Sequence, residues 1–209
     1  MRKSLASLVF LLASVFAAQS AKADDACSGV SGNIVTNCGF ETGDFTGWSG
    51  TALTDPNSGV DGSQPFSGSY GAFLGSFQDV TLSQTLNTVA GTTYTIEFAL
   101  NNGADADPAD GYPNDFSATF GGTTIFSETN VPEDSQTLLT FTALATGTST
   151  DLSFTSANVA DYWNLDSVSV AAEATPVPEP GSLMLLGTGV VGLAGALRRR
   201  LRPSLRNGL

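Results

Sequence analysis

The segment TYTIEFAL, residues 93–100, decides the fold class. Its larger apolar side chains fall on every second residue, at Tyr94, Ile96, Phe98 and Leu100, and mostly polar residues lie between them. A period of two is typical of a β-strand that buries one face and exposes the other. We therefore expect a half-buried strand in this segment.

The same alternation recurs along the middle of the chain. It is found at residues 80–86, 116–120, 139–143 and 152–154. Turn signals separate these runs, among them Ala90-Gly91, Gly121-Gly122 and Gly147. No segment between Asp24 and Thr175 has a sustained helical period. Eight or more short strands in a domain of about 150 residues predict an all-β fold, a two-sheet β-sandwich with a jelly roll as the preferred topology.

The charges are divided between the ends and the middle of the chain. All eight basic residues lie within residues 1–23 and 198–209, all twenty acidic residues lie between Asp24 and Glu179, and the chain has no His. The absence of cationic side chains from residues 24–173 excludes Ser-His-Asp triads, Schiff-base lysines, arginine clamps for phosphate and imidazole metal sites. The negative charge also excludes nucleic acid as a partner. Carboxylate chemistry, binding of hard cations and recognition of neutral ligands remain possible.

Residues 1–23 have the three parts of a secretory signal peptide. Arg2 and Lys3 form a positive region, an apolar run follows, and Ala21-Lys22-Ala23 provides small residues for cleavage. We expect the general secretion machinery to export the chain and signal peptidase to cut after Ala23.

The two cysteines agree with export. Cys27 and Cys38 lie near the predicted mature N-terminus, and an even number of cysteines in an oxidising compartment favours one disulfide. Two free thiols are the alternative.

The C-terminus has its own order of features. Residues 174–180 form a Pro-rich stalk, residues 181–197 carry no charge, and residues 198–209 form a basic tail. As a helix, residues 181–197 would span about 25 Å, near the lower limit for crossing a bilayer. Basic residues after such a helix stay in the cytoplasm. We therefore expect a single transmembrane helix with the domain at residues 24–173 outside the inner membrane.

This order resembles the PEP-CTERM sorting signal of Gram-negative bacteria, in which a Pro-Glu-Pro motif precedes a Gly-rich apolar helix and a basic tail. Here the motif is Pro178-Glu179-Pro180. The resemblance implies that an exosortase-type transpeptidase recognises the motif and removes the helix. It also implies a cell-surface or extracellular protein associated with extracellular polysaccharide and biofilm. A plain single-pass anchor is the alternative, and it leaves the motif unexplained.

Two further segments resemble the opening and closing strands of jelly-roll carbohydrate-binding modules. They are residues 33–43, followed by Gly47-Trp48, and residues 162–170. The family's closing strand usually carries two adjacent Asp, whereas here Asp166 is followed by Ser. The resemblance implies that Glu41 and Asp166 help to bind a structural Ca²⁺, for which oxygen ligands are suited. Two solvated turn carboxylates are the alternative.

The closing segment also predicts an irregularity. Leu165 differs in parity from Val168 and Val170, so a regular strand cannot bury all three on one face. A β-bulge near Asp166 would restore the phase.

The function follows less directly from the residues. Exposed aromatic rings are platforms for sugars, and the candidates are Tyr70, Tyr112, Tyr162 and Trp163, for each of which burial is the alternative. We expect a non-catalytic binding or matrix protein that contacts extracellular polysaccharide. A self-associating adhesin is the alternative. A glycoside hydrolase or lyase is less favoured, because nothing in the spacing selects a pair of carboxylates.

Overall fold

The computed structural model describes residues 25–107, 109 and 111–173. The predicted signal peptide, Pro-rich stalk, transmembrane helix and basic tail lie outside these residues. Among the residues described, no helix is long and apolar enough to cross a membrane. Chain contacts divide the protein after Glu173, and every strand described here comes before that point. Residues 25–173 therefore contain their own core and can be studied as a separate domain.

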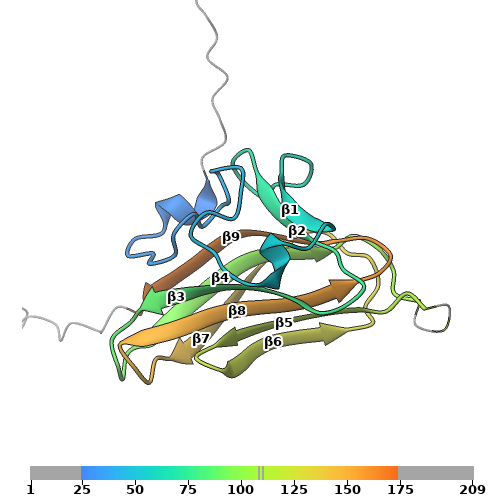
Figure 1. Ribbon diagram of the computed structural model, residues 1–209. Helices are drawn as coiled ribbons and strands as arrows, with labels where there is room; N and C mark the ends of the chain where they lie inside the picture. Colours follow the sequence, from blue (N-terminus) through green and yellow to red (C-terminus); the bar gives the residue numbers. More distant parts are fainter. Residues whose placement is uncertain (1–24, 108, 110, 174–209) are drawn as a thin grey trace, which may run out of the picture. The chain divides into compact units, whose positions relative to one another are not determined.

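The described part of the chain holds two short 3-10 helices and nine strands. The helices are η1 (Ala26–Gly29) and η2 (Thr51–Leu53). The strands are β1 (Ser58–Asp61), β2 (Gly71–Leu74), β3 (Val80–Asn87), β4 (Thr93–Asn102), β5 (Asn114–Phe120), β6 (Thr123–Thr129), β7 (Thr137–Leu144), β8 (Ser149–Asn158) and β9 (Trp163–Ala172) (Figure 1).

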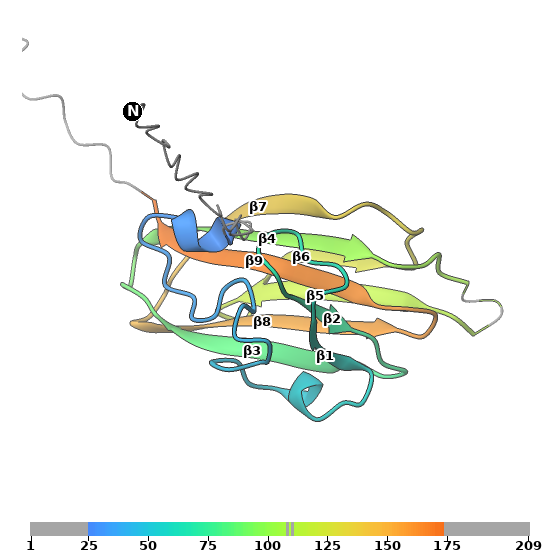
Figure 2. The ribbon, with the colours of Figure 1, turned by 90° about the horizontal axis from the view of Figure 1, so that it is seen from above.

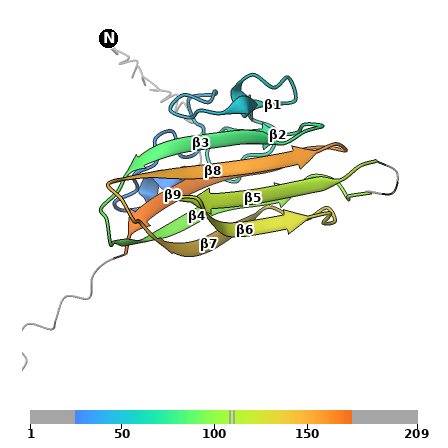
Figure 3. The ribbon, with the colours of Figure 1, turned by 60° about the horizontal axis from the view of Figure 1, so that its bottom comes forward.

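The strands form two antiparallel sheets. One sheet has the order β1-β2-β9-β4-β7 and the other β3-β8-β5-β6. Figure 3 shows the four-stranded sheet in front of β9, β4 and β7. The predicted all-β, two-sheet sandwich is therefore confirmed.

The core contains aromatic side chains from both sheets. Phe98 of β4 lies at its centre and is fully buried. The ring centroids of Phe141, Phe116, Phe126 and Phe154 lie 5.2–6.2 Å from that of Phe98. Phe141 comes from the same sheet and the other three from the facing sheet. The alternation read at residues 93–100 thus points these rings into the space between the sheets.

The expected bulge is present on β9. Glu97 of β4 pairs with Ser169 and Ala99 pairs with Asp166, so three steps along β9 match two along β4. The backbone of Ser167 takes up the extra residue with φ of +51°. The bulge resets the strand, and three apolar side chains are consequently buried together: Leu165, Val168 and Val170.

The opening segment differs from the expected first strand. Residues 33–38 lie beside β9 and are not a regular strand. The Ile34 amide donates to the Val170 carbonyl at 3.0 Å, and the Val168 amide donates to the Cys38 carbonyl at 2.9 Å. Asn37 and Phe40 have φ of +50° and +57°, which turn the chain out of an extended path.

Candidate functional site

A groove with a volume of about 590 Å³ lies on the five-stranded sheet near the start of β9. Its floor is a row of side chains from neighbouring strands. Phe73 of β2 pairs with Asn164 of β9, which pairs in turn with Asn101 of β4. Because Leu100 pairs with Thr137, Gln136 continues the row just before β7. One aromatic ring and three amides therefore lie side by side.

Two rings at one end of the floor depend on glycines for their positions. The centroids of Phe73 and Tyr162 are 5.2 Å apart in an edge-to-face arrangement. A Cβ at Gly59 would lie 2.6 Å from Phe73 Cζ, and one at Gly75 would lie 2.4 Å from Tyr162 Cδ1. The two rings thus occupy space that a side chain at position 59 or 75 would fill.

The polar part of the floor has unused hydrogen-bonding capacity. Gln136 Nε2 is buried and has no hydrogen-bond partner within the described part of the chain. Asn101 Nδ2 makes one long contact, 3.5 Å, with the Asp134 carbonyl. Amide groups beside an aromatic ring can take the hydroxyls of a sugar while the ring covers its apolar face.

Carboxylates surround this floor. They come from the end of β1, from the β6–β7 connection and from the β8–β9 connection: Asp61, Glu133, Asp134 and Asp161. Residues 25–173 contain no Lys, Arg or His to balance them. The groove therefore has a negative potential that disfavours anionic ligands.

The structure separates the four aromatic residues named from the sequence. Tyr162, 39% exposed, lines the groove. Tyr70 and Tyr112 are exposed and do not line it. The prediction of Trp163 as a ligand platform is wrong, because its side chain is fully buried and its Nε1 donates to the Ala157 carbonyl at 3.1 Å. Parity explains the error: Trp163 and Asn164 point to opposite faces of β9.

A second polar site lies where Glu41 and Asp166 hold the β1–β2 connection. Glu41 Oε1 accepts hydrogen bonds from the backbone amides of residues 69 and 70, at 2.7 and 3.0 Å. Asp166 Oδ2 accepts from those of residues 66 and 67, at 2.8 and 3.0 Å. Asp166 is fully buried, so it is not a solvated turn carboxylate.

Electrostatics connect three carboxylates at this second site. Burial raises the pKa of Asp166 to about 6, against the lowering effect of the amides that it accepts from, and the charge of Asp25 raises it further. Burial also raises the pKa of Asp25, with a smaller contribution in the same direction from Glu41. Asp25 is therefore a third member of this carboxylate cluster, which we define as Asp25, Glu41 and Asp166.

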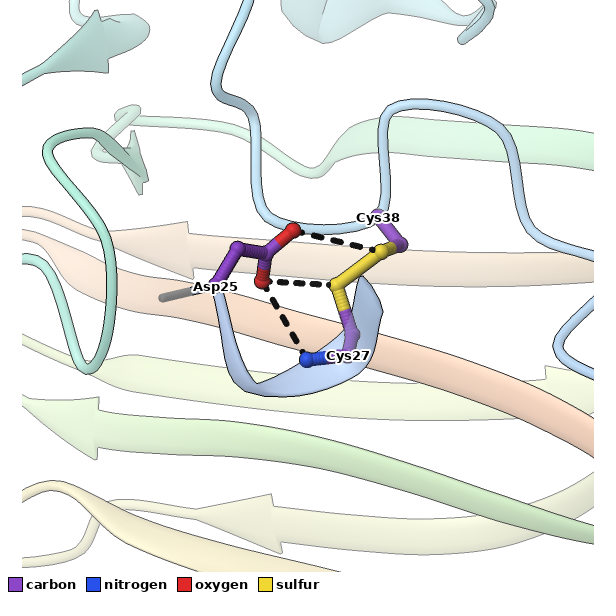
Figure 4. A group of neighbouring side chains, drawn as sticks. All are labelled: Asp25, Cys27 and Cys38. Carbon is purple, nitrogen blue, oxygen red and sulfur yellow. Dashed lines mark hydrogen bonds between the residues drawn. A yellow bond between two sulfur atoms is a disulfide. The ribbon is translucent and has the colours of Figure 1, made fainter. Parts of the chain in front are cut away.

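Asp25 also lies against the disulfide, which joins Cys27 and Cys38 as the sequence predicts. Its carboxylate accepts from the Cys27 amide at 3.2 Å and lies 2.9 Å from Cys27 Sγ and 3.5 Å from Cys38 Sγ (Figure 4). Sulfurs in a disulfide carry no proton and are not thiolate ligands. This group has the spacing of a metal site but cannot be one while the bond is intact.

Similarity to known proteins bears first on the C-terminus. Residues 176–200 match the model of the PEP-CTERM protein-sorting motif. The C-terminus is a PEP-CTERM sorting segment. The match contains Pro178-Glu179-Pro180, the motif identified from the sequence. No curated protein matches the chain.

Solved structures resemble the domain before that PEP-CTERM segment. The CBM22-1 xylan-binding domain of Paenibacillus barcinonensis Xyn10C has 16% identity and a TM-score of 0.50, with 66% of this chain and 92% of that one covered. The CBM22-1-CBM22-2 tandem domain of the same protein has 19% identity and a TM-score of 0.50, with 78% and 50% covered. At these identities the likeness shows the fold alone, and this fold is the jelly-roll sandwich of carbohydrate-binding modules that the sequence predicts.

The sequence did not indicate the floor residues Phe73, Asn101, Gln136 and Asn164, nor Asp25. Phe73 lies between Ala72 and Leu74, which are buried, so it occupies the outward parity of a short strand. A large aromatic residue at an outward position was the available signal. Gln136 lies in the β6–β7 connection and Asp25 directly precedes η1, and in neither place does periodicity indicate which side chains turn inward.

Proposed function

We propose that the protein is exported from a Gram-negative bacterium, held as an inner-membrane precursor and sorted by an exosortase-type transpeptidase to the cell surface or beyond. The sorting motif at residues 176–200, the signal-peptide features of residues 1–23 and the disulfide support this proposal. Signal peptidase and the general secretion machinery are the partners at the other end of the chain.

We further propose that the domain is a non-catalytic component that binds extracellular polysaccharide, with a role in biofilm or matrix. The row of Phe73, Asn164, Asn101 and Gln136 carries this proposal, because it places a ring face beside three amides along one groove. The carboxylates around it favour a glycan without acidic groups.

A carboxylate-dependent hydrolase is the weaker candidate. Such an enzyme needs a proton donor with a raised pKa next to the bond that it cleaves. Asp166 has a raised pKa, but it is fully buried under the β1–β2 connection and does not line the groove. Turnover of a polysaccharide by the purified domain would restore the enzymatic alternative.

Affinity electrophoresis of residues 24–173 in gels that contain a panel of neutral and acidic polysaccharides tests the binding proposal. Phe73→Ala and Tyr162→Ala should each weaken binding about tenfold, since loss of one ring contact is worth about 1.4 kcal/mol. Tyr112→Ala is the matched control, because it removes an exposed tyrosine outside the groove. Binding by all three variants equal to that of the wild-type domain would refute the groove as the binding site.

We also propose that the carboxylate cluster binds a structural Ca²⁺. The charge of Glu41 raises the pKa of Asp25, the charge of Asp25 raises that of Asp166, and the domain has no cationic side chain to offset these carboxylates. Carboxylate oxygens are the ligands that Ca²⁺ prefers. The bound ion would supply the missing positive charge.

The melting temperature of residues 24–173 in Ca²⁺ and in chelator tests this proposal. The wild-type domain should melt several degrees higher in Ca²⁺, and Glu41→Ala should abolish most of that difference. Glu173→Ala, which removes a carboxylate from the end of the domain, should keep it. A wild-type domain indifferent to Ca²⁺ and chelator would refute the site.

A further inference from the structure

Three of the four sheet edges in the described domain carry a feature that discourages pairing with another chain. At β3, Ser49 pairs with Ser83, and Thr51 exchanges hydrogen bonds with Thr81. β1 has four residues and ends in an acid, while β6 has an irregular register and contains Glu128. Covered edges, short edges, charges and bulges are the usual protections against edge-to-edge association.

The fourth edge, β7, has none of these features. It is eight residues long, pairs with β4 without a register shift, and contains no charged residue or proline. No charge occurs anywhere in residues 135–150. Leu138 and Leu144 are 42% and 56% exposed. Figure 2 shows β7 at the outer margin of its sheet.

The free backbone groups of β7 can be assigned from its pairing with β4. The Ala145 amide donates to the Thr92 carbonyl at 2.9 Å, so odd-numbered residues direct their amides and carbonyls toward β4. Even-numbered residues direct theirs outward. The groups available to another strand are consequently those of Leu138, Thr140, Thr142 and Leu144.

These four residues are complementary to themselves. In an antiparallel pair about a two-fold axis, one register sets Thr140 opposite the partner's Thr142 and Leu138 opposite the partner's Leu144. All outward amides and carbonyls then meet a counterpart, leucine lies against leucine, and threonine lies against threonine. Shifting the partner strand by two residues in either direction still sets outward backbone groups opposite one another. It leaves at least one of the four residues opposite a residue outside the set.

We propose that β7 is a homodimerisation strand, and that two copies join their five-stranded sheets through antiparallel β7–β7 pairing. The charge distribution favours a second copy at this edge. Two domains with no cationic residue repel one another over most of their surfaces. β7 contributes no charge of its own to that repulsion, although the Glu97 carboxylate on β4 accepts a hydrogen bond from Thr140 Oγ1 at 3.0 Å, and apolar side chains are exposed along it.

Sedimentation equilibrium of residues 24–173 tests the proposal, with Thr142→Pro as the main variant. Proline removes an amide that points away from β4, so it leaves the β4–β7 ladder intact and eliminates hydrogen bonds to the partner. The wild-type domain should dimerise below about 100 μM, and Thr142→Pro should weaken dimerisation at least tenfold. Thr142→Val keeps the amide and should dimerise like the wild type. Dimerisation equal in all three proteins would overturn the proposal, as would a monomeric wild type.

A charge-swap experiment tests the register, and does not depend on the proline variant folding. One variant carries Leu138→Lys and Leu144→Lys, and the other carries Leu138→Glu and Leu144→Glu. Each alone should be monomeric, because like charges face one another across the axis, and an equimolar mixture should form heterodimers. A mixture that stays monomeric, or single variants that still dimerise, would overturn the register.

Discussion

The buried carboxyl of Asp166 makes a specific prediction about pH. Its pKa rises from 3.8 to about 6 on folding without a cation. Each pKa unit corresponds to about 1.4 kcal/mol, so the ionised group lowers the free energy of unfolding by about 3 kcal/mol. Because the pKa is raised on folding, the domain is more stable by this amount below the unfolded pKa of 3.8, where the carboxyl is protonated in both states. That stability is lost as the pH rises through about 6.

The perturbation is Asp166→Asn, which removes the titration at the same position. In chelator, the free energy of unfolding of the wild-type domain should rise by about 2–3 kcal/mol more than that of the variant between pH 7 and pH 4. The prediction concerns the difference between the two proteins and not the wild type alone. Burial also raises the pKa values of Asp115 and Glu128, and these groups contribute to the pH dependence of both proteins. Urea unfolding at a series of pH values, followed by tryptophan fluorescence, measures it.

Saturating Ca²⁺ should reverse this dependence if the ion binds the carboxylate cluster. A cation next to Asp166 favours the ionised form and lowers its pKa, so that protonation now releases the ion and destabilises the fold. Parallel curves for wild type and Asp166→Asn in chelator would refute the assignment of the raised pKa to this carboxyl. If Ca²⁺ leaves the pH dependence of the free energy of unfolding unchanged, the ion site is refuted and the raised pKa of Asp166 is not.

Three further changes test the packing of the domain. Gly75→Ala places a methyl group where the Tyr162 ring lies and should weaken polysaccharide binding about tenfold in affinity electrophoresis; unchanged binding would show that the ring position is unimportant. Replacing both Cys27 and Cys38 by Ala opens a loop with a sequence separation of 11 and should lower the free energy of unfolding by about 3 kcal/mol in urea, and no loss would contradict this. Phe98→Ala leaves a cavity among four rings and should cost about 3–5 kcal/mol by the same measurement; a loss below about 1 kcal/mol would contradict the central position of this ring.

Local periodicity was sufficient to predict most of the sandwich. The run at residues 93–100 lies within β4, and the other alternating runs lie within β3, β5, β7 and β8. The conflict of parity between Leu165 and Val168 correctly predicted the bulge on β9, because a side chain's face depends only on its position along its own strand. The short β1 and β2 were not predicted, since four residues among glycines carry too little alternation to recognise.

The groove could not be predicted in the same way. Its floor joins residues from four parts of the chain that only strand order and register bring together: Phe73, Asn101, Gln136 and Asn164. Residue type alone therefore cannot distinguish Trp163, which is buried, from Phe73, which lines the groove. The distinction between the faces of β9 required knowing which parity faced the other sheet.

The β1–β2 connection links the two candidate sites physically. Its first part, with Ser63 and Gln64, lines the groove, and its last part is held by Glu41 and Asp166 through backbone amides. These carboxylates fix the connection only while they stay in place, and three acidic groups without a counter-charge tend to separate. A cation at the cluster would therefore stabilise one wall of the groove as well as the fold. On this reasoning, the absence of basic residues from the domain fits both proposals, because the same negative charge that disfavours anionic ligands in the groove would also attract an ion to the carboxylate cluster beside its wall.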